Sequence, residues 1–249
     1  MSHVFAIGIG PGDPQLLTMQ AREALERCTA VAGYRPYLES LGDLLAGKRL
    51  LEGQSMRQEV QRCTLALEAA LAGETVAVVS SGDSGIYGMA GLLLELAQEE
   101  RFAQVEVVTV PGVTAASSCA ALVGAPFMND FAVISLSDLM TPADLIRRRL
   151  EALAGVDLPV AIYNPASRGR HELLEYAVAT FRQAGGNLPA AVVRDAYRPG
   201  QLIRLCHLDD FPFAFVQMTT LVIIGNSHTI LDGRRMFCQR GYRKELRSL

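Results

Sequence analysis

No apolar run in this chain approaches the ~18 residues that a membrane-spanning helix needs, although half of its 249 residues are apolar. The N-terminus also lacks the basic segment and long apolar stretch of a signal peptide. These absences predict a cytoplasmic protein with no membrane association. A chain of this length can bury a sizeable core, as one large unit or as two domains of about 120 residues each.

Cysteine and histidine are too scattered to indicate a metal site. No two of the five cysteines are close enough for a Cys-x-x-Cys clip, and an odd number argues against a framework of disulfides. The four histidines show no metal-ligand spacing either. We therefore expect no metal held by the protein. We interpret Cys28 and Cys119, which lie in apolar helix-like patterns, as buried structural thiols.

Long basic runs with interleaved aromatic residues are also missing, so we expect no nucleic-acid partner. The charge is nevertheless unevenly distributed. Residues 1–125 hold 8 Lys and Arg against 14 Asp and Glu, whereas residues 126–249 hold 15 against 12. Fourteen of those 15 are arginines, which are suited to bidentate binding of carboxylates or phosphates. This excess indicates either an anionic ligand or simply an arginine-rich solvated surface.

Short apolar runs alternate with amphipathic segments, a pattern typical of βαβ units with a largely parallel sheet. The expected strands are residues 3–9, 29–33, 75–80, 104–109, 131–136, 158–163, 190–194, 201–206 and 218–224. The expected helices are residues 18–28, 55–72, 88–100, 113–123, 142–154 and 170–184. The last three strands have no long helix between them, which predicts antiparallel pairing in a mixed sheet.

The stretch LVGAPFMND (residues 122–130) is the best candidate for a linker, because it contains Gly, Pro and Asn and the strand pattern restarts after it. We therefore predict two α/β domains, residues 1–122 and 123–249. Ligands in open α/β sheets bind beyond the carboxyl ends of the strands. The loops that follow the predicted strands are thus the places to look for a site.

The first of these loops is GIGPGDPQLLT (residues 8–18). Its glycine spacing departs from the G-x-G-x-x-G fingerprint of dinucleotide folds, its prolines keep the turn extended, and no Gly-Lys-Ser/Thr follows. Asp13 can cap a short helical turn that begins at Pro14. That interpretation leaves Gly8, Gly10 and Gly12 unexplained, and glycines let a ligand approach the backbone closely.

Three further loops follow predicted strands. In SSGDSGIYG (residues 80–88), Asp83 either caps a helix or accepts hydrogen bonds from ribose hydroxyls or an ammonium group. In PGVTAASSCAALVG (residues 111–124), small residues at a helix start indicate tight packing or close contact with a ligand carboxylate or adenine. In YNPASRGR (residues 163–170), the two arginines form either a surface pair or an anion clamp.

Taken together, in this order and spacing, the four loops resemble those of the tetrapyrrole methylases, S-adenosylmethionine-dependent methyltransferases that lack the usual Rossmann fold. The resemblance extends from Val4 to about Arg243. Within the family, one branch methylates C17 of precorrin-3B, or of its cobalt counterpart, and contracts the ring during cobalamin biosynthesis. The segments similar to that branch are VAGYRPYLE (31–39), SLSDLMTP (135–142), NPASRGR (164–170) and GNSHTILDGRRMFCQRGY (225–242).

The resemblance implies two α/β domains with a cleft between them, a homodimer, S-adenosylmethionine as methyl donor with S-adenosylhomocysteine as product, and a small-molecule tetrapyrrole substrate. The residues it assigns to the methyl donor are Pro11, Ser81, Gly82, Asp83, Ile86, Thr114, Ala115, Asn164, Ala196 and Thr220. For the substrate, Gly10 and Gly12 leave room for the macrocycle. The arginines expected to bind its carboxylates are Arg168, Arg170, Arg194, Arg198 and Arg234. Ring contraction needs a proton acceptor or donor, for which Asp13 and Asp138 are the candidates.

Two positions depart from the family's pattern. Ser84 replaces a proline of many relatives, and Asn164 stands where several relatives have methionine. Other interpretations remain open: another corrin methylase, a relative that methylates ribosomal RNA, or a nucleotide sensor without catalysis. A nicotinamide-dependent reductase is disfavoured by the broken glycine spacing and the missing acid after the second strand. The sequence does not decide whether the substrate carries cobalt.

Overall fold

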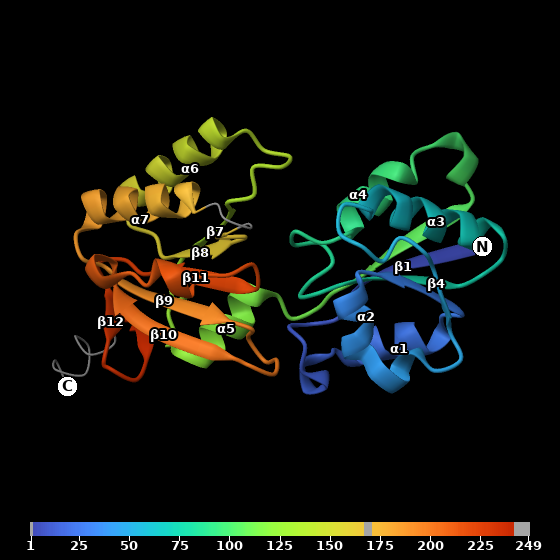
Figure 1. Ribbon diagram of the computed structural model, residues 1–249, viewed down its shortest axis with the longest axis horizontal. Coiled ribbons are helices and arrows are strands. Elements are labelled where there is room, and N and C mark those ends of the chain that lie inside the picture. The colour runs from blue at the N-terminus through green and yellow to red at the C-terminus, as the bar shows by residue number, and fades with distance from the viewer. Residues whose placement is uncertain (1, 167–170, 242–249) are drawn as a thin grey trace. The chain divides into compact units, whose positions relative to one another are not determined.

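The computed structural model describes residues 2–166 and 171–241 (Figure 1). The chain forms two compact units, Met1–Ala115 and Ala116–Leu249. Each unit combines a five-stranded sheet with helices, so the predicted α/β class is confirmed. Residues 122 and 123, where the sequence suggested a boundary, lie in the last turn of α5 (Ala115–Val123).

The first unit contains a sheet whose strands are all parallel, in the order β3-β2-β4-β1-β5. Its strands are β1 (Ser2–Gly8), β2 (Ala30–Gly33), β3 (Arg49–Leu50), β4 (Val76–Ser80) and β5 (Val105–Val110). Strands covered on both faces read as continuous apolar runs. Four of the five strands were therefore visible in the sequence, and the two-residue β3 was not.

Helices cover both faces of this sheet. They are α1 (Met19–Arg27), α2 (Arg35–Leu41), α3 (Glu59–Leu71) and α4 (Ala90–Leu96). Figure 1 shows α3 and α4 on one face and α1 and α2 on the other. Alternate residues of the strands belong to the hydrophobic cores on the two faces of the sheet. Ala6 and Val78 pack toward α3 and α4, whereas Ile7 and Val79 pack toward α1 and α2.

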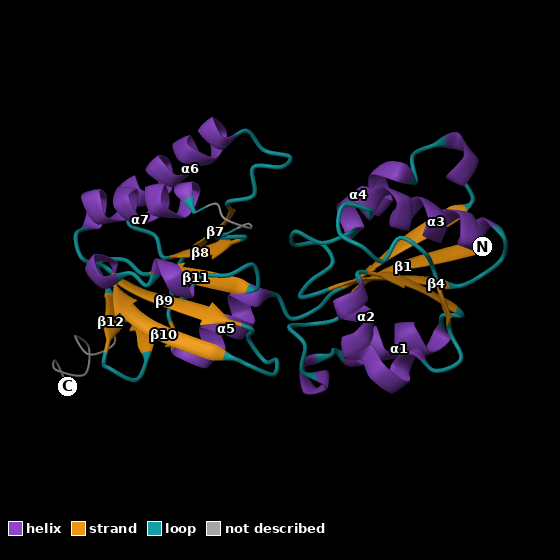
Figure 2. Cartoon of the chain, viewed as in Figure 1, coloured by secondary structure: helices purple, strands orange, loops and turns teal. Residues whose placement is uncertain are grey.

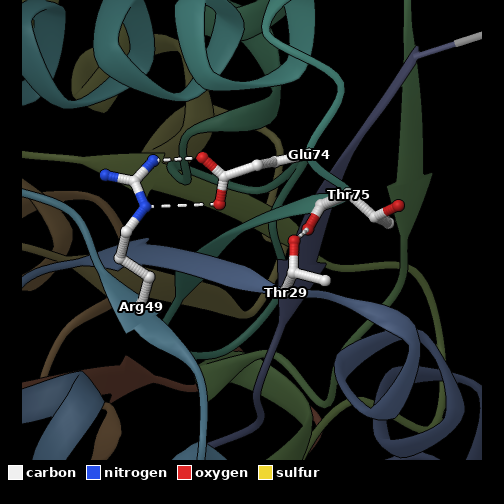
Figure 3. Close-up of polar contacts among 4 residues, drawn as sticks. All are labelled: Thr29, Arg49, Glu74 and Thr75. Atoms are coloured by element: carbon white, nitrogen blue, oxygen red, sulfur yellow. Dashed lines mark hydrogen bonds and ion pairs between the residues drawn. The ribbon is translucent and has the colours of Figure 1, made fainter.

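Polar contacts fix the amino ends of three strands of this sheet (Figure 3). Arg49 of β3 forms a two-pronged ion pair with Glu74, just before β4. The hydroxyl of Thr29, just before β2, donates to the carbonyl of Thr75 at 3.3 Å. These contacts hold the end of the sheet opposite to the loops that carry the candidate site residues.

The second unit contains a mixed sheet in the order β10-β9-β11-β8-β7. Its strands are β7 (Ala132–Ser135), β8 (Val160–Tyr163), β9 (Pro189–Arg194), β10 (Leu202–His207) and β11 (Thr220–Ile224). β7 and β8 are parallel, while β11 pairs antiparallel with both β8 and β9, and β10 antiparallel with β9. The prediction of antiparallel pairing in the last third of the chain is confirmed.

Two helices, α6 (Ala143–Gly155) and α7 (Glu172–Gly185), lie over one face of the mixed sheet (Figure 2). Leu150 and Leu174 of these helices are fully buried against Ile162 and Val192 of the sheet. None of the helices in the described part of the chain has the length and apolar character needed to span a bilayer.

A small second sheet in this unit corrects the predicted linker. β12 (Thr229–Leu231) pairs with β13 (Met236–Cys238), and β13 pairs in parallel with β6 (Gly124–Ala125). A Cβ on Gly124 would lie 2.6 Å from the carbonyl oxygen of Met236, so only glycine permits this approach. Residues 122–130 are therefore not a free linker: they begin with the end of a helix and a strand.

Candidate functional site

Three loops of the first unit meet at the carboxyl edge of its sheet. β4, β1 and β5 are neighbours in the parallel sheet, so the loops that follow them begin side by side. These loops are residues 9–18, 81–89 and 111–114. They contain most of the residues predicted to bind the methyl donor.

Glycines let these three loops touch one another. A Cβ on Gly112 would lie 2.2 Å from the carbonyl oxygen of Gly82 and 2.6 Å from the carbonyl carbon of Gly8. Gly10 and Gly82 exchange backbone hydrogen bonds of 3.0 and 2.7 Å. A Cβ on Gly10 would also come within 2.8 Å of the carbonyl oxygen of Leu16. The packing of the loops themselves thus accounts for Gly8 and Gly10, and a ligand role for Gly10 and Gly12 stays a prediction.

Asp83 connects two of the loops. Its Oδ1 accepts a hydrogen bond from the backbone N–H of Gly85 at 2.8 Å, and its Oδ2 accepts one from Gly112 at 2.9 Å. The next helix, α4, begins only at Ala90, so the interpretation of Asp83 as a helix cap is wrong. The carboxylate instead fixes the backbone around Gly82.

Ser84, at the position where many relatives carry proline, is fully buried. Its hydroxyl donates to the carbonyl oxygen of Val110, at the end of β5, at 3.2 Å. A proline could not make this bond. The departure from the family's pattern therefore replaces the stiffness of a proline ring with a hydrogen bond to the neighbouring strand.

Asp13 caps the short 3₁₀ helix Pro14–Leu16, as the sequence predicted. Its Oδ1 accepts a hydrogen bond from the backbone N–H of Gln15 at 2.8 Å. The residue lines a hollow of about 410 Å³, together with Gly12, Arg22 and Asp43 among others. Asp13 is thus placed beside open space, with one carboxylate oxygen engaged in the cap.

The remaining donor-binding candidates of the first unit, Pro11, Ser81, Ile86, Thr114 and Ala115, lie on the same edge. The side chain of Ile86 is 42% exposed and offers an apolar surface. Next to it, Tyr87 adopts a φ of 55°, a conformation that costs of order 1–3 kcal/mol in a non-glycine residue. Strain of this kind is concentrated where loops are shaped for binding.

In the second unit, the ends of β7, β8 and β9 share an edge with the start of β11. The amide nitrogen of Asn164 donates to the hydroxyl of Ser135 at 2.9 Å, which joins the loops after β8 and β7. Asn164, Asp195 and Tyr197 have φ values of 50°, 50° and 56°. Three strained residues therefore occupy one edge of this sheet.

Arg194 at the end of β9 is the clearest anion-binding candidate of this edge. Its guanidinium carbon lies 4.8 Å from the centre of the Phe215 ring. Its buried Nε has no hydrogen-bond partner among the described residues, and the carboxylate of Asp195 is 3.7 Å away. A ligand carboxylate would satisfy this donor.

Three other candidates, Thr220, Ala196 and Arg198, lie on this edge. The side chain of Thr220 is buried, and its hydroxyl accepts from the backbone N–H of Gln217 at 2.9 Å. Ala196 lies between the two strained residues Asp195 and Tyr197. The backbone N–H of Arg198 donates to the carbonyl oxygen of Asp195 at 3.0 Å, which closes the turn after β9.

Not all predicted residues are brought to these edges. Arg234 lies in the turn between β12 and β13, where its backbone N–H donates to Asp232 at 2.9 Å. Arg168 and Arg170 lie outside the described residues. Asp138, by contrast, lies in the loop that follows the end of β7 on the second unit's edge, and it is exposed there, as is Met140 at 94%.

Sequence reasoning missed Tyr163, the last residue of β8. Its hydroxyl accepts a hydrogen bond of 2.7 Å from the backbone N–H of Ala116, in the first turn of α5. This bond satisfies one of the free amides at the start of that helix. A tyrosine at the end of an otherwise aliphatic strand was the signal available in the sequence.

Comparison with known proteins identifies the class. Residues 3–212 match the family model described as Tetrapyrrole (Corrin/Porphyrin) Methylases, so the chain is a methyltransferase by class. It belongs to the tetrapyrrole methylase family.

The similarity to particular members extends over nearly the whole chain. A probable cobalt-factor III C(17)-methyltransferase of Salmonella typhimurium is 43% identical over 95% of this chain and 98% of its own length. The precorrin-3B C(17)-methyltransferase of a Sinorhizobium species is 35% identical over 91% of this chain and 89% of its own. The crystal structure of the methyltransferase CobJ superposes with a TM-score of 0.88 at 33% identity, covering 95% of this chain and 98% of that chain.

A uroporphyrin-III C-methyltransferase of Thermus thermophilus, solved in complex with S-adenyl homocysteine, shares the fold. It has a TM-score of 0.68 at 24% identity, over 90% of this chain and 97% of that one. The chain is thus similar, over nearly its full length, to methyltransferases named for C17 of cobalamin precursors.

Proposed function

We propose that the protein transfers a methyl group from S-adenosylmethionine to C17 of a cobalamin precursor, with contraction of the ring. The precursor is precorrin-3B, converted to precorrin-4, or cobalt-factor III. The observation that carries the proposal is the similarity, over 95% of the chain, to a protein named as a probable cobalt-factor III C(17)-methyltransferase. Because the identity is 43% to that cobalt-factor III relative and 35% to the precorrin-3B relative, the cobalt-containing substrate is the first to test.

The methyl donor is assigned to Pro11, Ser81, Gly82, Asp83, Ile86, Thr114, Ala115, Asn164, Ala196 and Thr220. The donor supplies a methyl group already activated on a sulfonium sulfur. The side-chain oxygens of Asp83 and Thr220 accept hydrogen bonds from the protein's own backbone. This fits a site in which main-chain groups bind the methyl donor. The exposed side chain of Ile86 adds an apolar contact. These residues would orient the reacting groups and exclude water, which together can supply most of the rate.

The substrate carries several acetate and propionate side chains, which are assigned to the arginines. Arg194 is supported by its Nε, which makes no hydrogen bond among the described residues and has only the Asp195 carboxylate, at 3.7 Å, as an ion-pair partner. Arg198 lies in the turn after the same strand. Arg168, Arg170 and Arg234 remain candidates from the resemblance alone. Asp13 and Asp138 remain the candidates for moving a proton during ring contraction. We also propose a homodimer, as the resemblance implies, and a cytoplasmic location, as the sequence composition led us to expect.

The test is an anaerobic incubation of the protein with S-adenosylmethionine and either cobalt-factor III or precorrin-3B. Mass spectrometry should show the gain of one methyl group, and the absorption spectrum should change to that of a contracted ring. A reaction without donor is the control. Binding of both ligands without any methylated product would contradict the proposal.

A second test addresses Arg194. Arg194→Met should weaken tetrapyrrole binding by about tenfold or more, since a charge-assisted hydrogen bond contributes ~1.5–3 kcal/mol. Binding of S-adenosylhomocysteine should be unchanged. Arg204→Met is the matched control, because Arg204 also lies over the Phe215 ring, at 5.6 Å. Equal tetrapyrrole affinities for the two variants would contradict the assignment of Arg194 to the substrate-binding site.

A further inference from the structure

Arg62 is a buried cation that the proposed reaction does not use. It belongs to α3, and only 3% of its surface is exposed. Its Nε donates to the carbonyl oxygen of Gly53 at 3.0 Å, and its Nη2 donates to that of Ser55 at 2.8 Å. Among the described residues it forms no ion pair with a carboxylate. Burying a guanidinium without a carboxylate is costly, so the two carbonyls are the groups that hold it.

The loop that Arg62 binds, residues 51–58, follows β3, and several hydrogen bonds hold its backbone. The carbonyl oxygen of Gln54 accepts from the backbone N–H of Arg35 at 3.0 Å, and its side chain donates to the carbonyl of Leu51 at 3.1 Å. The backbone N–H of Ser55 donates to the side chain of Gln58 at 3.0 Å. The loop therefore has a defined conformation without regular secondary structure.

Gly53 has a left-handed backbone conformation where this loop meets α3, so a side chain at this position would be strained. Gly53 has a φ of 80°, and a Cβ there would lie 3.4 Å from the Cα of Arg62. Four residues of the loop are exposed: Glu52, Ser55, Met56 and Arg57. Met56 is 54% exposed, and Arg57 is exposed with a φ of 63°. An exposed methionine beside an exposed arginine offers an apolar contact and a carboxylate-binding group together.

The position of the loop connects it with the candidate site of the first unit. β3 runs parallel to the other strands of its sheet, so residues 51–58 begin at the same carboxyl edge as the loop of Asp83. Arg62 also contacts that second loop, because its Nη1 lies 3.8 Å from the sulfur of Met89. The backbone N–H of Met89 in turn donates to the hydroxyl of Ser80, at the end of β4, at 3.0 Å.

We propose that Met56 and Arg57 form a further substrate-binding element, in which Arg57 binds a carboxylate side chain of the tetrapyrrole and Met56 contacts its ring. Arg62 is the positioning residue that holds this element in place. The inference rests on the proposed function, since it takes a tetrapyrrole with acidic side chains as the ligand. It adds two contacts and one supporting residue that neither composition nor motif indicated.

The first experiment measures the dissociation constants of cobalt-factor III and S-adenosylhomocysteine for Arg57→Ala. Tetrapyrrole binding should weaken about tenfold, as the loss of one charge-assisted hydrogen bond implies, with binding of S-adenosylhomocysteine unchanged. Arg148→Ala, on the exposed face of α6, is the control and should change neither constant. An unchanged tetrapyrrole constant in Arg57→Ala would overturn the proposal.

The positioning role is tested by a double-mutant cycle. Arg62→Lys should raise KM for the tetrapyrrole with little change in kcat, and adding Arg57→Ala to it should raise KM no further, because the loop is already displaced. Additive effects would mean that Arg62 only stabilises the fold. If Arg62→Lys folds poorly, Gly53→Ala takes its place in the test. It strains the same loop without removing the buried charge, and we expect it to raise KM for the tetrapyrrole in the same way.

The wild-type protein separates this inference from the proposed function. If it methylates cobalt-factor III while Arg57→Ala has the wild-type tetrapyrrole constant, only the loop's role is wrong. If the wild type binds no tetrapyrrole at all, both proposals are wrong.

Discussion

The carboxylate of Asp83 accepts a hydrogen bond from the backbone N–H of Gly112 at 2.9 Å, which connects the loop after β4 with the turn after β5. Its other oxygen accepts from Gly85 at 2.8 Å. One side chain therefore sets the geometry of the edge assigned to the methyl donor. Neither bond is local to a helix, so this role could not be recognised from the sequence spacing.

We predict that Asp83→Asn destabilises the protein by about 1–3 kcal/mol, because an amide has one oxygen where the carboxylate used two, and one backbone N–H would face an N–H₂ group. The free energy of unfolding in urea measures the loss. Asp130→Asn, at an exposed position, is the control and should stay within about 0.5 kcal/mol of wild type. Equal midpoints for Asp83→Asn and wild type would contradict this role.

A second prediction concerns Gly112. In Gly112→Ala the new methyl would sit 2.2 Å from the carbonyl oxygen of Gly82, so the loops must separate. We expect a loss of about 1–3 kcal/mol or more, together with weaker binding of S-adenosylhomocysteine. Gly91→Ala is the matched control, because nothing lies within 4 Å of its Cβ position in α4. That change should be neutral or stabilise by up to ~1 kcal/mol. If both variants unfold at the same urea concentration, the close packing of the loops is wrong.

A third prediction concerns Tyr163. Tyr163→Phe leaves the buried amide of Ala116 without its acceptor, which should cost about 1–2 kcal/mol. Tyr176→Phe removes a hydroxyl that bonds Glu151 at the surface and should change stability by less than ~0.5 kcal/mol. Thermal unfolding of the two variants side by side measures the difference. A smaller loss for Tyr163→Phe than for Tyr176→Phe would refute the capping role.

A fourth prediction concerns pH. Cys28 and Cys119 are buried and unpaired, as the sequence predicted. Burial raises the pKa of Cys119 to about 12 from an ordinary value of 9.0, and it raises the pKa of Cys63 to about 12 as well. A raised pKa means that the folded protein keeps protons that the unfolded chain loses. The contribution of these protonated thiols to the free energy of unfolding is therefore full below about pH 9 and is lost as the pH rises toward 12.

In Cys119→Ala, the fall in unfolding free energy between about pH 9 and 11 should be less steep than in wild type by ~1.4 kcal/mol per pH unit. Below pH 8 the two proteins should differ by a constant amount, which serves as the internal control. Urea titrations at each pH provide the measurement. Parallel curves across the alkaline range would show that the thiol ionises freely in the folded protein.

The strands of the first sheet were predictable because helices cover both of its faces, so that their apolar runs are continuous. Ala6 and Ile7, for example, face opposite cores and are both fully buried, so β1 reads as continuously apolar. The pairing of Gly124 with Met236 was not predictable, because a two-residue strand depends on a partner far along the chain. Gly-Ala-Pro in isolation has the composition of a loop.

The sequence located three loops that the structure places at one edge of the first sheet, but not the contacts between them. Three glycines within five residues were interpreted as room for a ligand to approach the backbone, and that role stays a prediction. The sequence could not tell whether a ligand or another loop approaches, and at Gly8 it is the turn at Gly112. Arg62 was missed because an arginine in an amphipathic helix reads as a solvated side chain, while its burial depends on the loop of Gly53 and Ser55.

The pairing of β6 with β13 has a consequence for how the protein is made. The first unit is complete once residue 115 has left the ribosome, and domains generally fold as units with the N-terminal one first during synthesis. The second unit cannot form its small sheet until Met236 has been synthesised, 112 residues after its partner Gly124. Unit 1 therefore folds while most of unit 2 is still being made. A ribosome stalled before residue 236 therefore holds a first unit with all its residues and a second unit that still lacks the partner strand of β6.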